Sequence, residues 1–194
     1  MGRLIIQDFV SADGFAADAN GDFTIFEQLE GSLDEFNASQ LAWLDRIEAM
    51  VLGANTYRLF ADYWPQATAE QDIIAPVLNA LRRHVFSSTL EAAPWGDDEP
   101  AVLESGDAVE AIRHIKREST RDVVLWGSLR LGKSFLAADE VDEVRLIVLP
   151  IALGKGVGVF PPGRPAHRMR LVSAQTHDAQ VVELVFDTRT SAQG

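Results

Sequence analysis

Four segments of the chain repeat one pattern, in which an apolar run gives way to small, hydrogen-bonding residues. The apolar runs are residues 4–6, 50–52, 85–86 and 123–126, and the small polar clusters that follow are residues 11–14, 53–57, 87–89 and 127–128. When strands end in such residues at one edge of a sheet, their ends can line a single ligand crevice. Backbone N–H groups and helix N-termini at that edge suit a phosphate-bearing cofactor.

The rest of the chain alternates between strand-like and helix-like patterns, which predicts an α/β architecture. We expect strands over 3–10, 49–52, 83–87, 101–103, 122–126, 143–149, 168–175 and 180–187, and helices over 33–48, 55–60, 71–81, 107–118 and 128–138. Since the last two strands are joined by a short turn near His177 and Asp178, they cannot be parallel neighbours, and the sheet should be mixed. No linker divides the 194 residues, so we expect a single domain with its core over about 3–187.

The start of the first expected helix carries its own signal. Ser32 is a suitable N-cap, and Glu35 follows three residues later, so the segment matches a capping box.

Composition and charge exclude several classes of protein. The net charge of −12 argues against a nucleic-acid partner, because binding to phosphates along a strand needs a basic face. There is no apolar run near the roughly 20 residues needed to cross a bilayer, and no apolar leader. Without cysteine there are no disulfides, and the four histidines have no ligand spacing, so we expect a cytoplasmic protein without a metal site.

One motif indicates a different function, that of a nucleoside triphosphatase. Residues 127–134 match the P-loop pattern G-x-x-x-x-G-K-[ST], after a strand and before a helix. However, bulky residues at 129–131 resist the conformations of a phosphate-binding loop, and the next expected strand ends without an Asp to hold magnesium. If a helix begins at Ser128 instead, three apolar residues share one of its faces: Leu131, Phe135 and Leu136. A nucleoside triphosphatase is therefore disfavoured.

With these segments in place, the chain resembles the dihydrofolate reductase-like superfamily, and within it the branch that includes the C-terminal reductase domain of bacterial riboflavin biosynthesis proteins. The likeness rests on residues 11–14, 52–57, 85–90 and 123–128, and above all on residues 141–156, an Asp-Glu pair, an apolar strand, Pro150 and then Leu-Gly-x-Gly. It spans about residues 3–187. It implies a three-layer α/β fold: a mixed, mostly parallel central sheet, helices on both faces and an antiparallel C-terminal hairpin.

The resemblance also implies an NADPH site along the strand ends. Residues 53–56 and 127–129 would form two pyrophosphate turns, residues 87–88 would lie beside the adenosine ribose, and residues 11–14 would fold over the nicotinamide and substrate. The implied cofactor residues are Ser11, Gly14, Gly53, Asn55, Thr56, Ser87, Ser88, Gly127, Ser128, Leu129, Arg130 and Leu131.

Two positions depart from the family's pattern. Ala54 stands where the family commonly has a basic residue that binds the 2′-phosphate of NADPH, so Arg82, Arg83 or Arg130 would have to replace it, and NADH is the alternative cofactor. Trp126 stands where many members have the first of two adjacent glycines, and it either narrows the cofactor turn or packs into the sheet.

Fewer residues indicate where the substrate would bind than indicate the cofactor site. Dihydrofolate reductases engage the pterin with a carboxylate on the first helix, and the matching place here falls near Asn37, so reduction of dihydrofolate is not expected. Asp13 either binds a substrate hydroxyl or amine or only stabilises its turn. Tyr57 and Trp64 either wall the substrate pocket or belong to the core.

These observations lead to one main interpretation and one alternative. The main one is an NADPH-dependent reductase that transfers hydride to a small heterocyclic or carbonyl-like acceptor, such as a pyrimidine related to riboflavin synthesis. The alternative is a non-catalytic member that binds a nucleotide or small ligand. We expect a homodimer formed through the late strands, because the related branch often pairs there and residues 181–186 are largely apolar.

Overall fold

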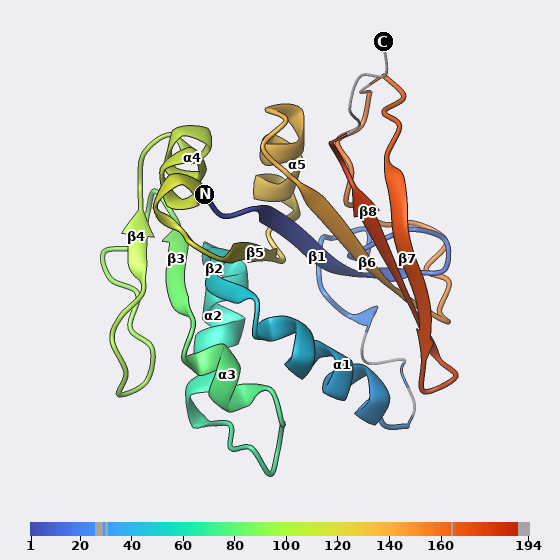
Figure 1. Ribbon diagram of the computed structural model, residues 1–194, viewed down its shortest axis with the longest axis horizontal. Coiled ribbons are helices and arrows are strands. Elements are labelled where there is room, and N and C mark those ends of the chain that lie inside the picture. The colour runs from blue at the N-terminus through green and yellow to red at the C-terminus, as the bar shows by residue number, and fades with distance from the viewer. Residues whose placement is uncertain (26–28, 30, 164, 190–194) are drawn as a thin grey trace.

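The computed structural model describes residues 1–25, 29, 31–163 and 165–189, and an eight-stranded sheet forms its centre (Figure 1). The strand order is β4-β3-β2-β5-β1-β6-β8-β7. Neighbours are parallel from β4 to β6, whereas β8 is antiparallel to both β6 and β7. The strands are β1 (Leu4–Ser11), β2 (Ile47–Gly53), β3 (Arg82–Phe86), β4 (Val102–Glu104), β5 (Asp122–Trp126), β6 (Glu143–Leu149), β7 (Arg170–His177) and β8 (Val181–Asp187). The expected mixed sheet and C-terminal hairpin are confirmed.

Helices cover both faces of this sheet. They are α1 (Asp34–Leu44), α2 (Ala54–Tyr63), the 3₁₀ turn η2 (Trp64–Gln66), α3 (Ala75–Asn79), α4 (Ala108–Glu118) and α5 (Leu129–Ala137). Side chains alternate across each strand, so Val123 and Leu125 of β5 pack with α4 and α5, while Val124 packs with α1, α2 and α3. The result is the three-layer arrangement that the family resemblance implied.

Two expected helices are shorter than the pattern suggested. The helix expected over 33–48 ends at Leu44, because Ile47 and the residues after it join β2. The helix expected over 71–81, with an interruption or a start near Pro76, is α3, which has Pro76 in its first turn. Proline lacks an N–H group and therefore favours the start of a helix over its interior.

The expected capping box at Ser32 and Glu35 is wrong. The Ser32 hydroxyl donates to Asp34, and the backbone N–H groups of Glu35 and Phe36 both donate to the Asp178 carboxylate at 3.0 Å. The Glu35 carboxylate in turn accepts from the Asp178 N–H group at 2.8 Å. Asp178 lies in the turn between β7 and β8 with a φ of 52°, so a residue 143 positions away in the sequence caps α1.

The segment that matched a P-loop forms a helix instead. Residues 129–131 are the first turn of α5, and Gly132 is buried within that helix. A Cβ atom at Gly132 would lie 3.4 Å from Ile6 Cδ1 and 3.5 Å from Leu125 Cδ2. The glycine therefore lets α5 pack closely on β1 and β5, and the segment does not curl around a phosphate.

No helix in the described part of the chain is long and apolar enough to cross a membrane.

The contribution of the Asp178 cap can be measured with two glycine variants. Asp178→Gly removes the acceptor of two α1 N–H groups, whereas Ala179→Gly changes the next residue, which also has a positive φ and whose side chain accepts no hydrogen bond. Glycine relieves backbone strain at both positions, so we expect Asp178→Gly to be less stable than Ala179→Gly by about 1 kcal/mol or more. Urea denaturation followed by circular dichroism measures both, and equal stabilities would contradict the role of the cap.

Candidate functional site

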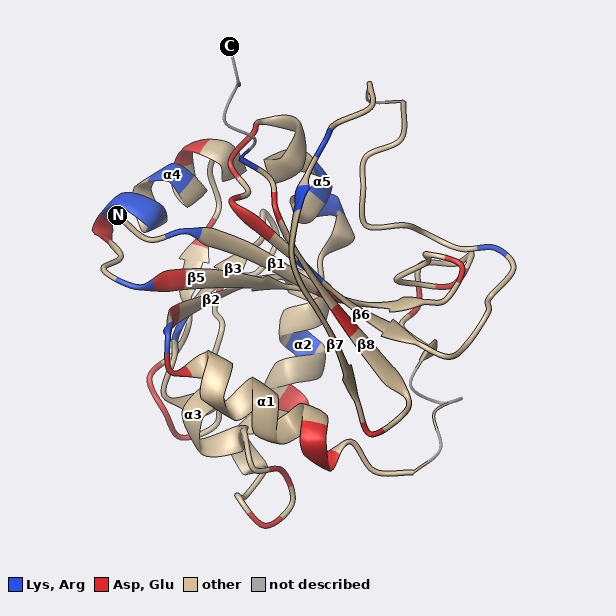
Figure 2. Cartoon of the chain, turned by 45° about the vertical axis from the view of Figure 1, so that its right-hand side comes forward, with Lys and Arg blue, Asp and Glu red and all other residues tan. Residues whose placement is uncertain are grey.

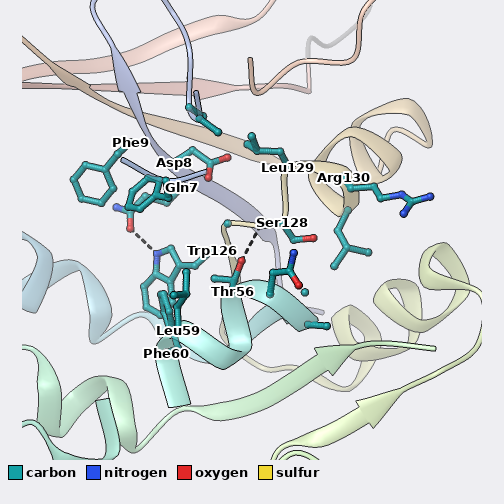
Figure 3. A pocket seen from close by; sticks show the side chains of 18 of the residues that line it. Gln7, Asp8, Phe9, Thr56, Leu59, Phe60, Trp126, Ser128, Leu129 and Arg130 are labelled. Carbon is teal, nitrogen blue, oxygen red and sulfur yellow. Dashed lines mark hydrogen bonds between the residues drawn. The ribbon is translucent and has the colours of Figure 1, made fainter. Parts of the chain in front are cut away.

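A cavity of about 950 Å³ lies where β2, β3 and β5 end, beside the middle of β1 (Figure 3). It is lined from β1 by residues 7–9, from the β2–α2 turn by 53–56, from the β3 end by 86–89 and from the β5–α5 turn by 126–131. Three of the four strand ends that the sequence pattern placed at one crevice therefore converge there, whereas the cluster at residues 11–14 does not line it. The volume is at the upper end of the roughly 300–1,000 Å³ usual for small-molecule sites.

The ends of β2 and β5 are packed against each other through two glycines. A Cβ atom on Gly53 would come within 2.4 Å of the Ser128 hydroxyl oxygen, and one on Gly127 within 2.5 Å of the Thr56 hydroxyl oxygen. Between them, the Ser128 N–H group donates to the Thr56 hydroxyl at 3.2 Å. Both glycines are therefore needed for this close approach.

This contact brings two helix N-termini to the cavity with their N–H groups uncapped. Neither Gly53 before α2 nor Ser128 before α5 provides a side-chain cap. In contrast, Asp178 caps α1, and Asp107 accepts from the N–H groups of Val109 and Glu110 at the start of α4. Unsatisfied N–H groups and the positive end of the helix dipole attract anions.

The turn into α5 is also strained. Gly127 and Ser128 are both left-handed, with φ values of 62° and 48°. A non-glycine residue in this region costs about 1 kcal/mol or more and is frequent at ligand sites.

The structure brings together ten of the twelve implied cofactor residues, since Ser11 and Gly14 do not line the cavity. Ser11 forms a turn with the next residues, and its hydroxyl donates to Asp13 at 2.5 Å. Of the two residues expected at the substrate pocket, Trp64 lines the cavity, whereas the Tyr57 hydroxyl donates to the Pro94 carbonyl oxygen.

Asp13 lies outside the cavity lining, and its carboxylate holds a neighbouring loop. It accepts from the N–H groups of Leu153 and Gly154 at 3.1 and 2.7 Å. The hydrogen bonds from the Ser11 hydroxyl and the Gly154 and Leu153 N–H groups lower the pKa of Asp13. An ionised, exposed carboxylate that stabilises a turn agrees with the structural alternative for this residue.

Two of the three arginines considered as replacements at the 2′-phosphate lie elsewhere. Arg82 and Arg83 are at the start of β3, at the opposite end of the strand from Ser87 and Ser88. Arg82 pairs with Glu48, and Arg83 donates to the carbonyl oxygens of Asn79 and Glu99. Arg130 lines the cavity.

Trp126 forms part of the cavity wall without filling the space between the strand ends. Its indole N–H group donates to the Gln7 side-chain oxygen at 2.7 Å, and the Gln7 amide donates to Gln40 of α1 at 2.6 Å. The Gln40 amide donates a hydrogen bond to the buried Glu183 carboxylate, which forms an ion pair with Arg145. Trp126 was expected either to narrow the turn or to pack into the sheet. The structure combines the two, because the indole N–H group is hydrogen-bonded to an interior side chain while the ring lines the cavity.

Asp8 is a cavity residue that the sequence analysis missed. It is 8% exposed, and burial raises its pKa to about 8, although a hydrogen bond from the Gly127 N–H group lowers the pKa in part. Figure 3 shows its carboxyl group pointing into the space beside Leu129. Two adjacent polar residues, Gln7 and Asp8, interrupt an apolar strand, and that interruption was the available signal.

Comparison with known proteins identifies the family. The model of the RibD C-terminal domain family matches residues 3–183. The chain belongs to the RibD C-terminal domain family. Protein YyaP of Bacillus subtilis, an uncharacterized protein, is 25% identical over 189 residues, which covers 95% of this chain and 94% of that protein.

Solved structures share the fold of this family member. A Shewanella sp. PV-4 protein named after riboflavin biosynthesis aligns with a TM-score of 0.75 and 19% identity, over 97% of this chain and 99% of that one. Dihydrofolate reductase from Enterococcus faecalis, solved with NADP(H), aligns with a TM-score of 0.63 and 13% identity, over 97% and 98% of the two chains. At these identities the likeness establishes a dihydrofolate reductase-like fold.

Across the described residues, no group of three or more His, Asp or Glu side chains is placed to hold a metal ion.

The raised pKa of Asp8 predicts a specific dependence of stability on pH. Above pH 4 the unfolded chain releases the Asp8 proton, while the folded chain keeps it until about pH 8. The stabilisation is therefore complete at low pH and is lost as the pH rises through 8. Relative to Asp8→Asn, wild-type unfolding free energy should fall by up to about 5 kcal/mol between pH 4 and pH 9.

Urea denaturation across this pH range provides the measurement. Asp22→Asn removes an exposed carboxylate from the same cavity, and its curve should parallel that of the wild type. A constant difference between wild type and Asp8→Asn would show that Asp8 has an ordinary pKa.

Proposed function

We propose that this family member is a reductase that uses a reduced nicotinamide dinucleotide, with NADPH as the expected cofactor. The main support is the pair of uncapped helix N-termini, of α2 and α5, which meet at a glycine-rich contact in a cavity of about 950 Å³. A dinucleotide carries a pyrophosphate, the kind of anion that such N–H groups bind. Membership in the RibD C-terminal domain family and the dihydrofolate reductase-like fold are consistent with this cofactor.

Each part of the cofactor has suitable residues available. The N–H groups of residues 54–56 and 129–130 can bind the pyrophosphate, and Ser87 and Ser88 can hydrogen-bond the adenosine ribose. Arg130 adds a positive charge at the α5 side. The bound cofactor would supply a hydride, which the protein's own side chains cannot.

Reduction of a carbonyl or imine also needs a proton, and Asp8 is suited to provide it. With a pKa of about 8 it remains protonated at neutral pH, and it lines the cavity. A general acid works best with a pKa close to the working pH. The ionised Asp13, outside the cavity lining, does not meet these requirements.

The second candidate is a non-catalytic member that only binds a nucleotide. Ala54 favours it, because this residue supplies no cation for the 2′-phosphate at the β2 end. Such a protein would bind NADPH without oxidising it in the presence of any acceptor.

Two alanine variants of α5 test the cofactor site. Arg130→Ala removes a cavity charge, whereas Lys133→Ala removes the same charge three residues further along the helix, outside the cavity lining. We expect Arg130→Ala to weaken NADPH and NADH binding about tenfold, which is the loss of one charged hydrogen bond, and Lys133→Ala to leave both unchanged.

Nicotinamide fluorescence and isothermal titration calorimetry measure both affinities. A larger effect on NADPH than on NADH would assign Arg130 to the 2′-phosphate. Wild type that binds neither cofactor below about 1 mM would rule out the reductase.

We also propose that the chain forms a homodimer through the sheet face of β6, β8 and β7 that lies opposite α1. Directly paired residues place Leu146 beside Leu184 and Leu171 beside Phe186 on this face. Leu171 is exposed, and the other three are only partly buried.

Light scattering should therefore give twice the mass of the 21.3 kDa chain. Leu184→Glu should give a monomer with unchanged circular dichroism, because it places a charge in the centre of the proposed interface. A wild-type monomer at micromolar concentration would contradict the proposal.

A further inference from the structure

The half of the cavity away from α5 is mainly aromatic. Its wall contains Phe9, Phe36, Leu59, Phe60, Trp64 and Trp126, which we call the aromatic half. The ring centroids of Phe60 and Trp126 are 6.0 Å apart, and those of Phe9 and Phe36 are 5.6 Å apart. In Figure 3, Phe9, Gln7, Trp126 and Phe60 gather on one side of the cavity, at a distance from Arg130.

Basic side chains are absent from this half. Among the residues that the structure describes, Arg130 is the only Lys or Arg that lines the cavity, and it extends away from Trp126 in Figure 3. Neither α1 nor α3 contains Lys or Arg, as the absence of blue on these helices in Figure 2 also shows. In α2 the basic residue is Arg58, which donates to the Asn55 side chain and does not line the cavity.

This lack of positive charge limits what the aromatic half can bind. A phosphate monoester carries roughly 1.5–2 negative charges at neutral pH and needs Arg, Lys or free N–H groups around it. Burial of an unpaired anion against aromatic rings costs several kcal/mol. The uncapped N-termini of α2 and α5 are, in the proposed function, occupied by the cofactor.

The polar groups of the aromatic half are nearly all engaged with one another. Gln7 is held between Trp126 and Gln40, and Gln40 bonds to Glu183. Asn37 is different: its half-buried side chain lines the cavity and bonds to no described residue. Its carboxamide can donate and accept one hydrogen bond each to a neutral ligand.

We propose that the hydride acceptor is an uncharged, flat, mainly apolar compound with a conjugated carbonyl group, which stacks on Trp126 and carries no phosphate. This inference rests on the proposed function, because it concerns the acceptor of the same site. The hydride, with its electron pair, passes from the reduced nicotinamide to an acceptor carbon, and the proton passes from Asp8 to the acceptor oxygen. The nicotinamide is oxidised and the acceptor is reduced by two electrons.

A matched pair of probes tests the proposal without relying on turnover. 1-Naphthol and 1-naphthyl phosphate share one ring system and differ in the phosphate, and calorimetry can measure both with and without saturating NADP⁺. With saturating NADP⁺, which would occupy the N-termini of α2 and α5, we expect 1-naphthol to bind at least about tenfold more tightly than 1-naphthyl phosphate. Without NADP⁺ the free N–H groups should narrow this difference, so the comparison in the presence of NADP⁺ decides. Equal or tighter binding of the phosphate would overturn the proposal, as would 1-naphthol binding weaker than about 1 mM.

A single added positive charge should reduce the preference for the uncharged probe. Leu59 lines the cavity and is 64% exposed, so Leu59→Lys should fold normally and place a cation beside the aromatic half. We expect it to raise the affinity for 1-naphthyl phosphate about tenfold, while the uncharged control Leu59→Gln does not. No gain in Leu59→Lys would show that charge does not control this preference.

The two proposals can fail separately. If NADP⁺ and NADPH do not bind but 1-naphthol is preferred, the reductase proposal fails and the uncharged pocket stands. If NADPH binds and the phosphate probe is preferred, only the acceptor proposal fails.

Discussion

The candidate site depends on the contact between the ends of β2 and β5. Gly53 makes room for the Ser128 side chain, and Gly127 makes room for that of Thr56. Any larger residue at either glycine would push the two turns apart, because a Cβ atom cannot approach within 3 Å of these neighbours. The starts of α2 and α5 would then no longer face the same space.

A strained residue and two uncapped helix N-termini meet at this contact. Ser128 has a left-handed backbone, and the α2 and α5 N-termini lack side-chain caps, while aspartates satisfy those of α1 and α4. Each of these features costs stability in the free protein and would be compensated by a bound anion. A bound anion would not stabilise the aromatic half of the cavity in this way. Aromatic rings line that half, together with the Asn37 carboxamide, which bonds to none of the described residues.

The aromatic half of the cavity is connected to the interior of the protein by a chain of hydrogen bonds. The chain of hydrogen bonds from Trp126 through Gln7 and Gln40 ends at the buried pair of Glu183 and Arg145, and the Arg145 guanidinium lies 4.3 Å from the Trp43 ring centroid. A buried network of this kind is costly to break, because removal of one member leaves its partners unsatisfied. It fixes Trp126 as part of the cavity wall and holds α1 against the sheet.

The sequence by itself determined the strands, the mixed sheet and the strand ends that form the side of the cavity at α2 and α5. These features follow from local rules: apolar runs form buried strands, and small polar residues end them. Residues 122–126 and 143–149 were predicted with their observed boundaries for this reason.

Only the tertiary structure decided which residues complete the site. Asp178 caps α1 from the β7–β8 turn, where local pattern had indicated Ser32, and Asp8 acquires a raised pKa because the ends of β1 and β5 bury it. Asp13 accepts a hydrogen bond from the Gly154 N–H group, and the Tyr57 hydroxyl donates to the Pro94 carbonyl oxygen. Arg82 and Arg83 lie at the opposite end of β3 from the cavity. Caps, burial and side-chain direction of this kind depend on contacts between segments that are distant in the sequence, and no local pattern encodes them.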